Sequence, residues 1–383
     1  MNTESIKLAF IKHFNHEPII VKSPGRINII GEHTDYNSGY VMPAAINKAI
    51  YVAVSRRSDQ EIHLYAESYT EMVKSSINDL KKSEKNWVNY ILGVADQLQK
   101  WEYNIGGFNL YIDGDVPLGA GLSSSAAVEC STAYALIELF SLSVPKLDIA
   151  KIAQKAEHSF AGVNCGIMDQ FASVFGKKDH AMLLDCKTLK HQYIPLKLEG
   201  HTLVLLNTNV KHSLVDSAYN RRRQQCEQGV AWIKAKISKV NTLRDVDLKM
   251  LDKYVKPKDV DVYQKCKFVV EENQRVVAAV EQLKKGDLKG LGQAMFETHD
   301  GLSRAYRVSC EELDFLVEYV KGLPYVLGAR MMGGGFGGCT LNLVETGKVK
   351  EFIDKLQRAY KKEFLINLDA YDVEIEDGAK LVL

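Results

Sequence analysis

The stretch VPLGAGLSSSAAVECSTAYAL, residues 116–136, places two glycines and three serines directly before an apolar segment. Apolar side chains occur nearly all the way round a helical projection of residues 124–140, which predicts a buried helix. A glycine-rich turn that opens a helix can bind phosphate through backbone N–H groups. The lysine of the P-loop motif is absent, because no Gly-Lys-Ser/Thr follows the glycines. The stretch is therefore either a tight turn before a capped helix or a nucleotide site of another kind.

The composition is that of an ordinary globular protein. At 383 residues the chain is long for a single hydrophobic core, so we expect two domains. With 49 Lys and Arg against 48 Asp and Glu, it lacks the basic excess typical of nucleic-acid binders. The seven cysteines never stand in C-x-x-C spacing, which favours reduced thiols over disulfides or a zinc site. No signal peptide or membrane-length apolar run is evident, so we expect a cytoplasmic protein.

Strand and helix patterns mix along the chain without the regular βαβ order of a doubly wound sheet. We therefore predict an α+β fold. From about residue 201 a new series of strands and helices begins. This restart places a domain boundary near residues 190–205 and divides the chain into 1–195 and 196–383.

Two local predictions concern the first strands. Pro24 and Gly25 interrupt a β-branched segment, so they are predicted to form a turn between two strands. Residues 47–58 and 61–68 both alternate in the manner of strands, and we predict that they pair with each other.

A helix predicted for residues 147–162 carries a carboxylate on its apolar side. Ile149, Ala153 and Phe160 form one stripe, and Glu157 falls on the same stripe. A buried charge without a partner is costly, so an inward Glu157 indicates a metal or cationic ligand. The alternative is a boundary glutamate that reaches solvent.

The run GGGFGG, residues 333–338, matches the dinucleotide-binding pattern G-x-G-x-x-G only as a string. That fingerprint ends a strand and opens a helix, whereas here a second apolar strand is predicted to follow. The Rossmann interpretation is thereby excluded. Such a run can instead bring the backbone close to a ligand or to another loop.

Residues 23–43, SPGRINIIGEHTDYNSGYVMP, collect hydrogen-bonding side chains around two predicted strand ends. The set consists of Arg26, Glu32, His33, Asp35, Tyr36 and Asn37. Such a cluster suits a small polyhydroxylated ligand, although each residue alone would be an ordinary surface residue. His33 has no second His or Cys at metal-ligand spacing, which favours a hydrogen-bonding role. Further along, Asp169 is predicted in the first turn of a short helix, where an aspartate is often only a cap.

Together these stretches resemble the galactokinase branch of the GHMP small-molecule kinases. Residues 25–37 resemble the galactokinase signature, 117–127 the ATP-phosphate motif and 331–339 the third motif of the family. Ser38 stands where the signature more often has glycine. The resemblance implies a two-domain GHMP kinase fold of mixed sheets and helices, with the active site in the cleft between the domains. It also implies that the N-terminal domain carries the first two motifs and a ferredoxin-like C-terminal domain the third.

The resemblance further implies roles for individual residues. Asp169 would lie beside the anomeric hydroxyl of the sugar, and Arg26 near Asp169 and the transferring phosphoryl group. The sugar hydroxyls would be bound by Glu32, His33, Asp35, Gly166 and Tyr219. The triphosphate would be wrapped by Gly119, Gly121, Leu122, Ser123, Ser124, Ser125 and Ala126. Ser125 and Glu157 would hold Mg²⁺, and Asp169 would either accept the hydroxyl proton or only orient the hydroxyl.

Three functions remain open from the sequence. The first is an ATP:galactose 1-phosphotransferase acting as a monomer, with no nucleic-acid or membrane partner, in the first committed step of galactose (Leloir) metabolism. The second is a kinase of a related sugar, such as N-acetylgalactosamine, galacturonate or arabinose. The third is a catalytically silent sugar and ATP sensor that regulates transcription. Arg26, Asp169 and an uninterrupted LSSSAA favour an enzyme over a sensor. We interpret the basic run at 221–223 as a solvated helix face with structural ion pairs.

Overall fold

The computed structural model describes residues 2–211 and 215–383, and its largest sheet is built mainly from the N-terminal half of the chain. This six-stranded sheet has the order β13-β1-β3-β6-β4-β5. Its strands are β1 (Ile19–Asn28), β3 (Pro43–Arg56), β4 (Glu61–Ala66), β5 (Glu71–Ser76), β6 (Phe108–Gly114) and β13 (Lys380–Leu381). β4 and β6 pair in parallel, whereas the other neighbours are antiparallel, so the sheet is mixed.

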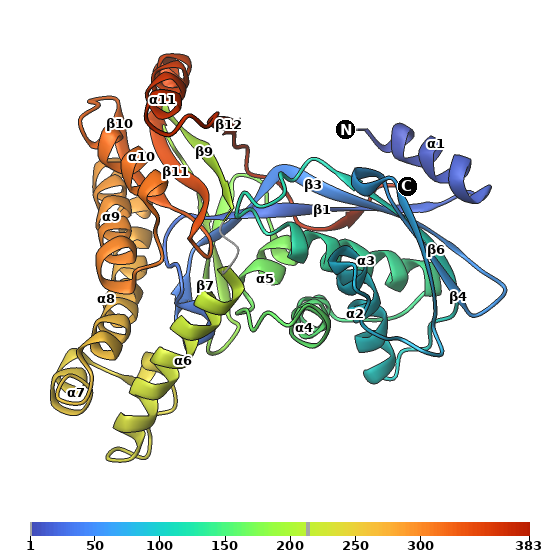
Figure 1. Ribbon diagram of the computed structural model, residues 1–383, viewed down its shortest axis with the longest axis horizontal. Coiled ribbons are helices and arrows are strands. Elements are labelled where there is room, and N and C mark those ends of the chain that lie inside the picture. The colour runs from blue at the N-terminus through green and yellow to red at the C-terminus, as the bar shows by residue number, and fades with distance from the viewer. Residues whose placement is uncertain (1, 212–214) are drawn as a thin grey trace.

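Helices cover both faces of this sheet. Four lie on one face, and their apolar side chains pack with the strands into the main core (Figure 1). These are α2 (Asn86–Lys100), α3 (Ser124–Phe140), α4 (Lys146–Ala156) and α5 (Met168–Phe175). On the other face, α1 (Thr3–Phe14) buries Ile6 and Phe10 against Tyr65 and Tyr111 of the strands. Within the described residues, no helix is long and apolar enough to cross a membrane.

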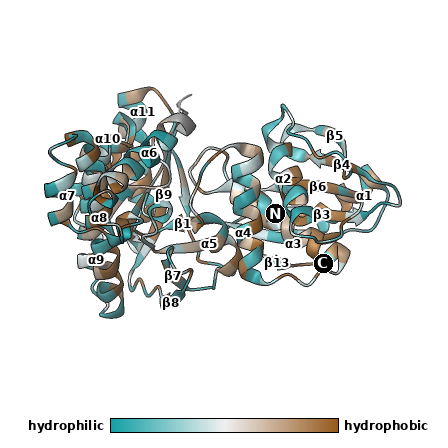
Figure 2. Cartoon of the chain, turned by 90° about the horizontal axis from the view of Figure 1, so that it is seen from below, coloured by the Kyte–Doolittle hydropathy of each residue, from teal (hydrophilic) through white to brown (hydrophobic). Residues whose placement is uncertain are grey.

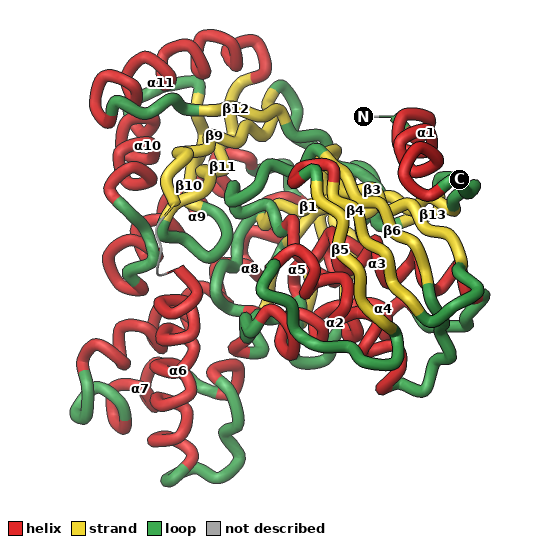
Figure 3. The backbone as a smooth tube through the Cα atoms, turned by 45° about the vertical axis from the view of Figure 1, so that its right-hand side comes forward, coloured by secondary structure: helices red, strands yellow, loops and turns green. Residues whose placement is uncertain are grey.

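The second half of the chain builds a four-stranded sheet with the order β10-β11-β9-β12, distinct from the first in Figure 3. Its strands are β9 (His201–Lys211), β10 (Val326–Met331), β11 (Gly337–Glu345) and β12 (Asp369–Asp372). Around it lie α6 (Val215–Lys234), α7 (Leu248–Tyr254), α8 (Val260–Lys284), α9 (Leu288–Asp300), α10 (Glu311–Lys321) and α11 (Val349–Phe364). A small third sheet consists of β2 (Tyr40–Val41), β7 (His180–Asp185) and β8 (His191–Pro195).

Seen from below, helices α6 to α11 gather at one end of the molecule and β3 to β6 at the other (Figure 2). β1 and α5 lie between the two groups in this view. The predicted α+β class is confirmed by this arrangement. The predicted boundary at 195/196 falls between β8 and β9 and stays a prediction, since β13 comes from the end of the chain and joins the first sheet.

Two of the local predictions are wrong. Pro24 and Gly25 form no turn, because β1 runs straight through them with a bulge between Pro24 and Arg26. Gly25 instead allows another chain segment to approach, since a Cβ there would lie 2.8 Å from the carbonyl oxygen of Leu122. β3 and β4 do not pair with each other, because β6 lies between them.

The glycine-rich stretches take the conformations that the sequence predicts. α3 spans the predicted residues 124–140, and most of its side chains are buried on every side. The glycine run 333–338 joins β10 to β11, which pair as an antiparallel hairpin. No helix follows these glycines, so the exclusion of a dinucleotide fingerprint is confirmed.

Candidate active site

A cavity of about 130 Å³ brings together residues from distant parts of the chain. The 12 residues that line it come from the signature, from residues 157–165, from the first turn of α5, from α6 and from the β10–β11 glycine run. They are Arg26, Glu32, His33, Asp35, Glu157, Val163, Cys165, Met168, Asp169, Tyr219, Gly333 and Gly334. Most are polar, so the cavity can offer hydrogen bonds on several sides to one small ligand.

Asp169 and Arg26 form the ion pair at the centre of this cavity. Asp169 lies in the first turn of α5, and Arg26 Nε and Nη2 each donate to one of its carboxylate oxygens at 2.8 Å. Burial would lower the pKa of Arg26, but the Asp169 and Glu32 carboxylates outweigh it and raise that pKa. Nη1 donates to the carbonyl of Gly121 at 2.7 Å, and the Ser123 hydroxyl donates to Asp169. The pair therefore joins the glycine-serine turn to the cavity.

Glu32 is held by a partner that the sequence analysis did not identify. Arg330, at the end of β10, is fully buried and donates from Nη2 to Glu32 Oε1 at 3.0 Å. The Gly333 N–H donates to the same oxygen at 2.8 Å. Burial would raise the pKa of Glu32, but the Arg330 and Arg26 guanidiniums hold it below its usual value. Glu32 is therefore an ionised hydrogen-bond acceptor. The sequence feature that could have identified Arg330 is its position directly before the motif MMGGGFGG, residues 331–338.

Among the residues that the structure describes, Asp35 has no ion-pair partner. Burial and the neighbouring Asp169 carboxylate raise the pKa of Asp35 to about 7. Gly166 lies directly against this side chain, since a Cβ on Gly166 would come within 2.0 Å of Asp35 Oδ2. Gly166 does not line the cavity itself, but the absence of a side chain there leaves room for Asp35.

Aromatic rings close one side of the cavity. The His33 ring lies 5.4 Å from that of Tyr219 and 5.8 Å from that of Tyr36, measured between centroids. His33 adopts a left-handed conformation with φ of 61°, which an ordered turn must hold in place. Among the described residues, no cluster of three or more His, Cys, Asp and Glu side chains could hold a metal.

The backbone of the glycine-serine turn has a conformation that suits the binding of an anion. Gly119, Gly121 and Ser123 have φ between 57° and 75°, and α3 begins at the next residue, Ser124. The first N–H groups of a helix have no partner within the helix and can bind a negative charge. The side chains of Leu122 and Ala126 are buried, so both would contribute backbone atoms only. The turn packs against the glycine run of the β10–β11 hairpin, since a Cβ on Gly333 would lie 3.1 Å from Gly121 O.

Glu157 points inward, so the solvent-reaching alternative is wrong. Its Oε2 accepts from Gln170 Nε2 at 2.7 Å and from the Cys165 thiol at 3.4 Å. Burial and Asp169 raise the pKa of Glu157 to about 7, although the Ser125 hydroxyl opposes the shift. A buried carboxylate beside a hydroxyl, with no cation paired to it among the described residues, fits Mg²⁺, which prefers oxygen ligands and retains waters. Glu129, which the sequence analysis missed, lies beyond Gln170 in α3.

A second cavity, of about 230 Å³, opens on the other side of the glycine-serine turn. Ser124 and Ser125 line it together with aromatic and apolar side chains of the first sheet and α2. The Tyr69 and Trp87 rings are stacked there, with centroids 6.1 Å apart.

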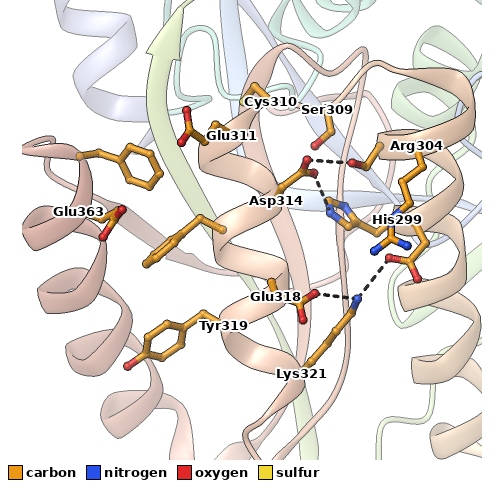
Figure 4. A pocket seen from close by; sticks show the side chains of 14 residues that line it. His299, Arg304, Ser309, Cys310, Glu311, Asp314, Glu318, Tyr319, Lys321 and Glu363 are labelled. Carbon is orange, nitrogen blue, oxygen red and sulfur yellow. Dashed lines mark hydrogen bonds and ion pairs between the residues drawn. The ribbon is translucent and has the colours of Figure 1, made fainter.

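A wider hollow of about 930 Å³ lies away from these residues, around α10 (Figure 4). His299 Nε2 lies 3.1 Å from Asp314 Oδ1, and the Ser303 hydroxyl donates to Asp314 Oδ2 at 2.8 Å. Lys321 donates to Glu318 and Asp300. None of the predicted site residues lines this hollow.

Family models match three parts of the chain. Residues 8–56 match the galactokinase galactose-binding signature, 89–177 the GHMP kinases N-terminal domain and 279–362 the GHMP kinases C-terminal model. A galactokinase from Thermotoga maritima is 44% identical over 94% of this chain and 99% of its own length. One from Clostridium acetobutylicum is 40% identical over 100% of this chain and 98% of its own.

Solved structures give the same result. A crystal structure of Lactococcus lactis galactokinase complexed with galactose has a TM-score of 0.95 and 33% identity, and the match covers 98% of this chain and 99% of that one. Methanococcus jannaschii mevalonate kinase shares the fold, with a TM-score of 0.67 at 18% identity. The fold and the site therefore define a GHMP kinase. Within that class the chain belongs to the galactokinase family of ATP-dependent sugar kinases.

Proposed function

We propose that the chain transfers the γ-phosphate of MgATP to the anomeric hydroxyl of α-D-galactose, giving galactose 1-phosphate and ADP. The observation that carries this proposal is the Asp169–Arg26 pair, which lies in a sugar-sized polar cavity and contacts the glycine-serine turn. The solved relative that binds galactose supports the choice of sugar. We further propose that the chain acts as a monomer in the cytoplasm, in the first committed step of galactose metabolism.

Galactose would bind in the 130 Å³ cavity. Its hydroxyls would contact Glu32, His33, Asp35 and Tyr219, with Gly166 leaving the space beside Asp35. A site that pairs each hydroxyl with a fixed polar group rejects an epimer, because the epimer leaves buried groups without partners. Glu32 stays ionised beside Arg330 and Arg26, so it can accept a hydrogen bond from a sugar hydroxyl.

ATP would lie across the glycine-serine turn. Its base would enter the 230 Å³ cavity beside Tyr69 and Trp87, where aromatic rings can stack on it. Its phosphates would face the N–H groups at the start of α3, from residues 119–126. Ser125 and Glu157 would hold Mg²⁺, which offsets charge on the phosphate oxygens when bound.

The transfer would form a bond between the anomeric oxygen and the γ-phosphorus and break the bond from that phosphorus to the bridging oxygen of ADP. Asp169 would orient the anomeric hydroxyl and accept its proton as the new bond forms. Arg26 would stabilise the negative charge on the transferring phosphoryl group. Its contact with the Gly121 carbonyl keeps the guanidinium between the carboxylate and the phosphate loop.

The test is ADP release from the purified protein with MgATP and a panel of sugars. The panel contains galactose, glucose, N-acetylgalactosamine, galacturonate and arabinose. We expect turnover with galactose and a loss of about a hundredfold or more in kcat for Asp169→Asn. Asp354→Asn, an exposed change on α11, is the matched control and should leave kcat unchanged.

Other outcomes would redirect the proposal. Turnover with a different sugar would keep the mechanism and change the substrate. Binding of galactose and ATP without turnover would contradict the enzyme and favour a sensor. Full activity of Asp169→Asn would remove Asp169 from the reaction.

A further inference from the structure

A chain of buried hydrogen bonds runs from the sugar cavity into the interior. His33 Nδ1 lies 2.8 Å from the Tyr36 hydroxyl, which lies 2.7 Å from the Tyr306 hydroxyl. The Tyr306 hydroxyl is in turn 3.3 Å from Cys226 Sγ on α6. The chain thus links the segment after β1 to two segments of the second half that the sequence analysis did not connect with it.

Tyr306 is the most firmly held residue in this series of hydrogen bonds. Its side chain is fully buried, and its ring packs against Phe268 with centroids 5.0 Å apart. Its backbone carbonyl accepts from Arg222 Nε at 2.7 Å, and the preceding carbonyl of Ala305 accepts from Lys265 Nζ at 2.7 Å. Arg222 and Lys265 therefore hold the backbone at residues 305 and 306, and the packing against Phe268 holds the Tyr306 ring.

His33 is neutral in the folded protein. Burial lowers the pKa of His33 to about 4, although the Glu32 carboxylate opposes the shift. A neutral imidazole carries its proton on one nitrogen only, and the partner of the other nitrogen decides which. The Gly334 backbone also opposes the lowering of this pKa. Within the described residues, buried Nε2 has no partner at hydrogen-bonding distance, and His33 lines the cavity beside Gly334. Nε2 is therefore the nitrogen left for a ligand.

The proposed sugar complex favours one tautomer at this position. Ionised carboxylates such as Glu32 only accept, so sugar hydroxyls must donate to them. A hydroxyl that donates to a carboxylate still has lone pairs that can accept from a donor group. An Nε2–H group supplies that donor, and Nδ1 must then accept from the Tyr36 hydroxyl.

We propose that Tyr306, acting through Tyr36, is a positioning residue that holds His33 with its proton on Nε2, ready to donate to a sugar hydroxyl. In this arrangement the Tyr306 hydroxyl donates to the Tyr36 oxygen, and the Tyr36 hydroxyl donates to His33 Nδ1. The inference rests on the proposed sugar-binding function of the cavity. It assigns substrate specificity in part to a residue that does not touch the substrate.

The first test reads the tautomer directly and needs no substrate. In ¹⁵N-histidine-labelled protein, the His33 signals are assigned by their absence in His33→Gln. We expect protonated Nε2 and unprotonated Nδ1 in the wild type, and a mixture of both tautomers in Tyr306→Phe. Tyr360→Phe is the matched control, because Tyr360 is equally buried and its hydroxyl donates to Thr208 O at 2.8 Å instead. A wild type protonated on Nδ1, or a Tyr306→Phe spectrum identical to the wild type, would overturn the proposal.

The second test is a double-mutant cycle on sugar kinetics. We expect Tyr306→Phe to raise the KM for galactose about tenfold, the effect of one lost hydrogen bond, with the KM for ATP unchanged. In a His33→Gln background the same change should alter that KM less than about twofold. An equal effect in both backgrounds would show that Tyr306 does not act through His33. If the wild type turns over no sugar, the proposed function fails while the tautomer test still decides the role of Tyr306.

Discussion

Three carboxyl groups around one cavity differ in the cations beside them. Glu32 has the buried Arg330 as a partner, and its pKa is lowered. Among the described residues, neither Asp35 nor Glu157 has an ion-pair partner, and burial raises the pKa of each to about 7. At neutral pH, therefore, Glu32 is a permanent acceptor, and the charge of the other two depends on what is bound. A galactose hydroxyl at Asp35 or a metal at Glu157 would favour the ionised form.

The raised pKa of Asp35 makes stability depend on pH. In the unfolded chain this carboxyl titrates near 4, so between about pH 4 and 7 the folded protein holds more protons than the unfolded one. The contribution of Asp35 to the free energy of unfolding therefore falls as the pH rises through that range. We expect the Tm of ligand-free Asp35→Asn, relative to the wild type, to increase by a few degrees from pH 5 to pH 8. Thermal unfolding at matched pH values measures this difference, and a constant difference, as expected for Asp354→Asn, would contradict it.

Gly166 offers a second test at the scale of one residue. A Cβ at this position would come within 2.0 Å of Asp35 Oδ2, so Gly166→Ala must displace that carboxylate. We expect the KM for galactose to rise about tenfold or more, with the KM for ATP unchanged. Gly322→Ala is the control, because a Cβ there meets nothing within 4 Å. Equal kinetics for the two variants would mean that Asp35 does not bind the sugar.

At the scale of elements, the site is the meeting of a turn and a hairpin. The turn before α3 and the glycine run between β10 and β11 touch at Gly121 and Gly333. The same Gly333 donates its N–H to Glu32. One glycine thus contacts both the glycine-serine turn and Glu32. Since we propose that these bind ATP and galactose, the two substrates would share one structural support.

We expect Gly333→Ala to weaken both substrates together. Gly333 has a φ of 78°, and a Cβ there would crowd Gly121 O at 3.1 Å, so the hairpin must shift. The KM values for ATP and for galactose should each rise roughly tenfold. Gly347→Ala, in the turn after β11, meets nothing within 4 Å and should behave as the wild type. Steady-state kinetics with each substrate varied in turn measures both KM values. A higher KM for one substrate alone would contradict the shared support.

Local patterns predicted the elements well where one helix face or one turn decides the outcome. The apolar periodicity located α3 and placed Glu157 inward, and Asp169 lies in the first turn of a short helix, as predicted. The Pro24-Gly25 turn failed because the glycine serves a contact with a distant loop rather than a change of direction. Local sequence carries no information on such a contact.

Hydrogen-bond partners that lie far apart in the sequence could not be predicted for the same reason. Arg330 lies within hydrogen-bonding distance of Glu32, 298 positions earlier in the sequence, and Tyr306 of Tyr36, 270 positions earlier. Strand pairing has the same character, and β6 inserts between β3 and β4 although it follows both. The resemblance to a family supplied the roles of the motif residues, but it named neither Arg330 nor Tyr306.

At the scale of the whole molecule, the end of the chain completes the first sheet. β13 pairs with β1 through Val21 and Leu381, and the N–H of Ile20 donates to the carbonyl of Leu383 at 2.9 Å. Just before β13, the N–H of Ala379 donates to Ser173 O of α5 at 2.7 Å. The same segment therefore closes the edge of β1 and supports the helix that carries Asp169.

A chain that stops after Glu376 should lose stability and activity together. It lacks β13 and the backbone hydrogen bonds to β1 and α5, so we expect the Tm to fall by roughly 5 °C or more. The kcat should fall as well, because α5 is less firmly held, whereas the KM for ATP should stay near its normal value. Thermal unfolding and steady-state kinetics measure both effects. A truncated protein with unchanged Tm would show that β13 adds nothing to the sheet.

The return of β13 to β1 also has a consequence for biosynthesis. A strand without a neighbour exposes a row of unpaired N–H and C=O groups on which another chain can pair. β13 comes after the second sheet in the chain, so this edge of β1 stays open while the second half is being translated. During that interval the nascent chain can pair wrongly with another chain, and protection by a chaperone would matter most then.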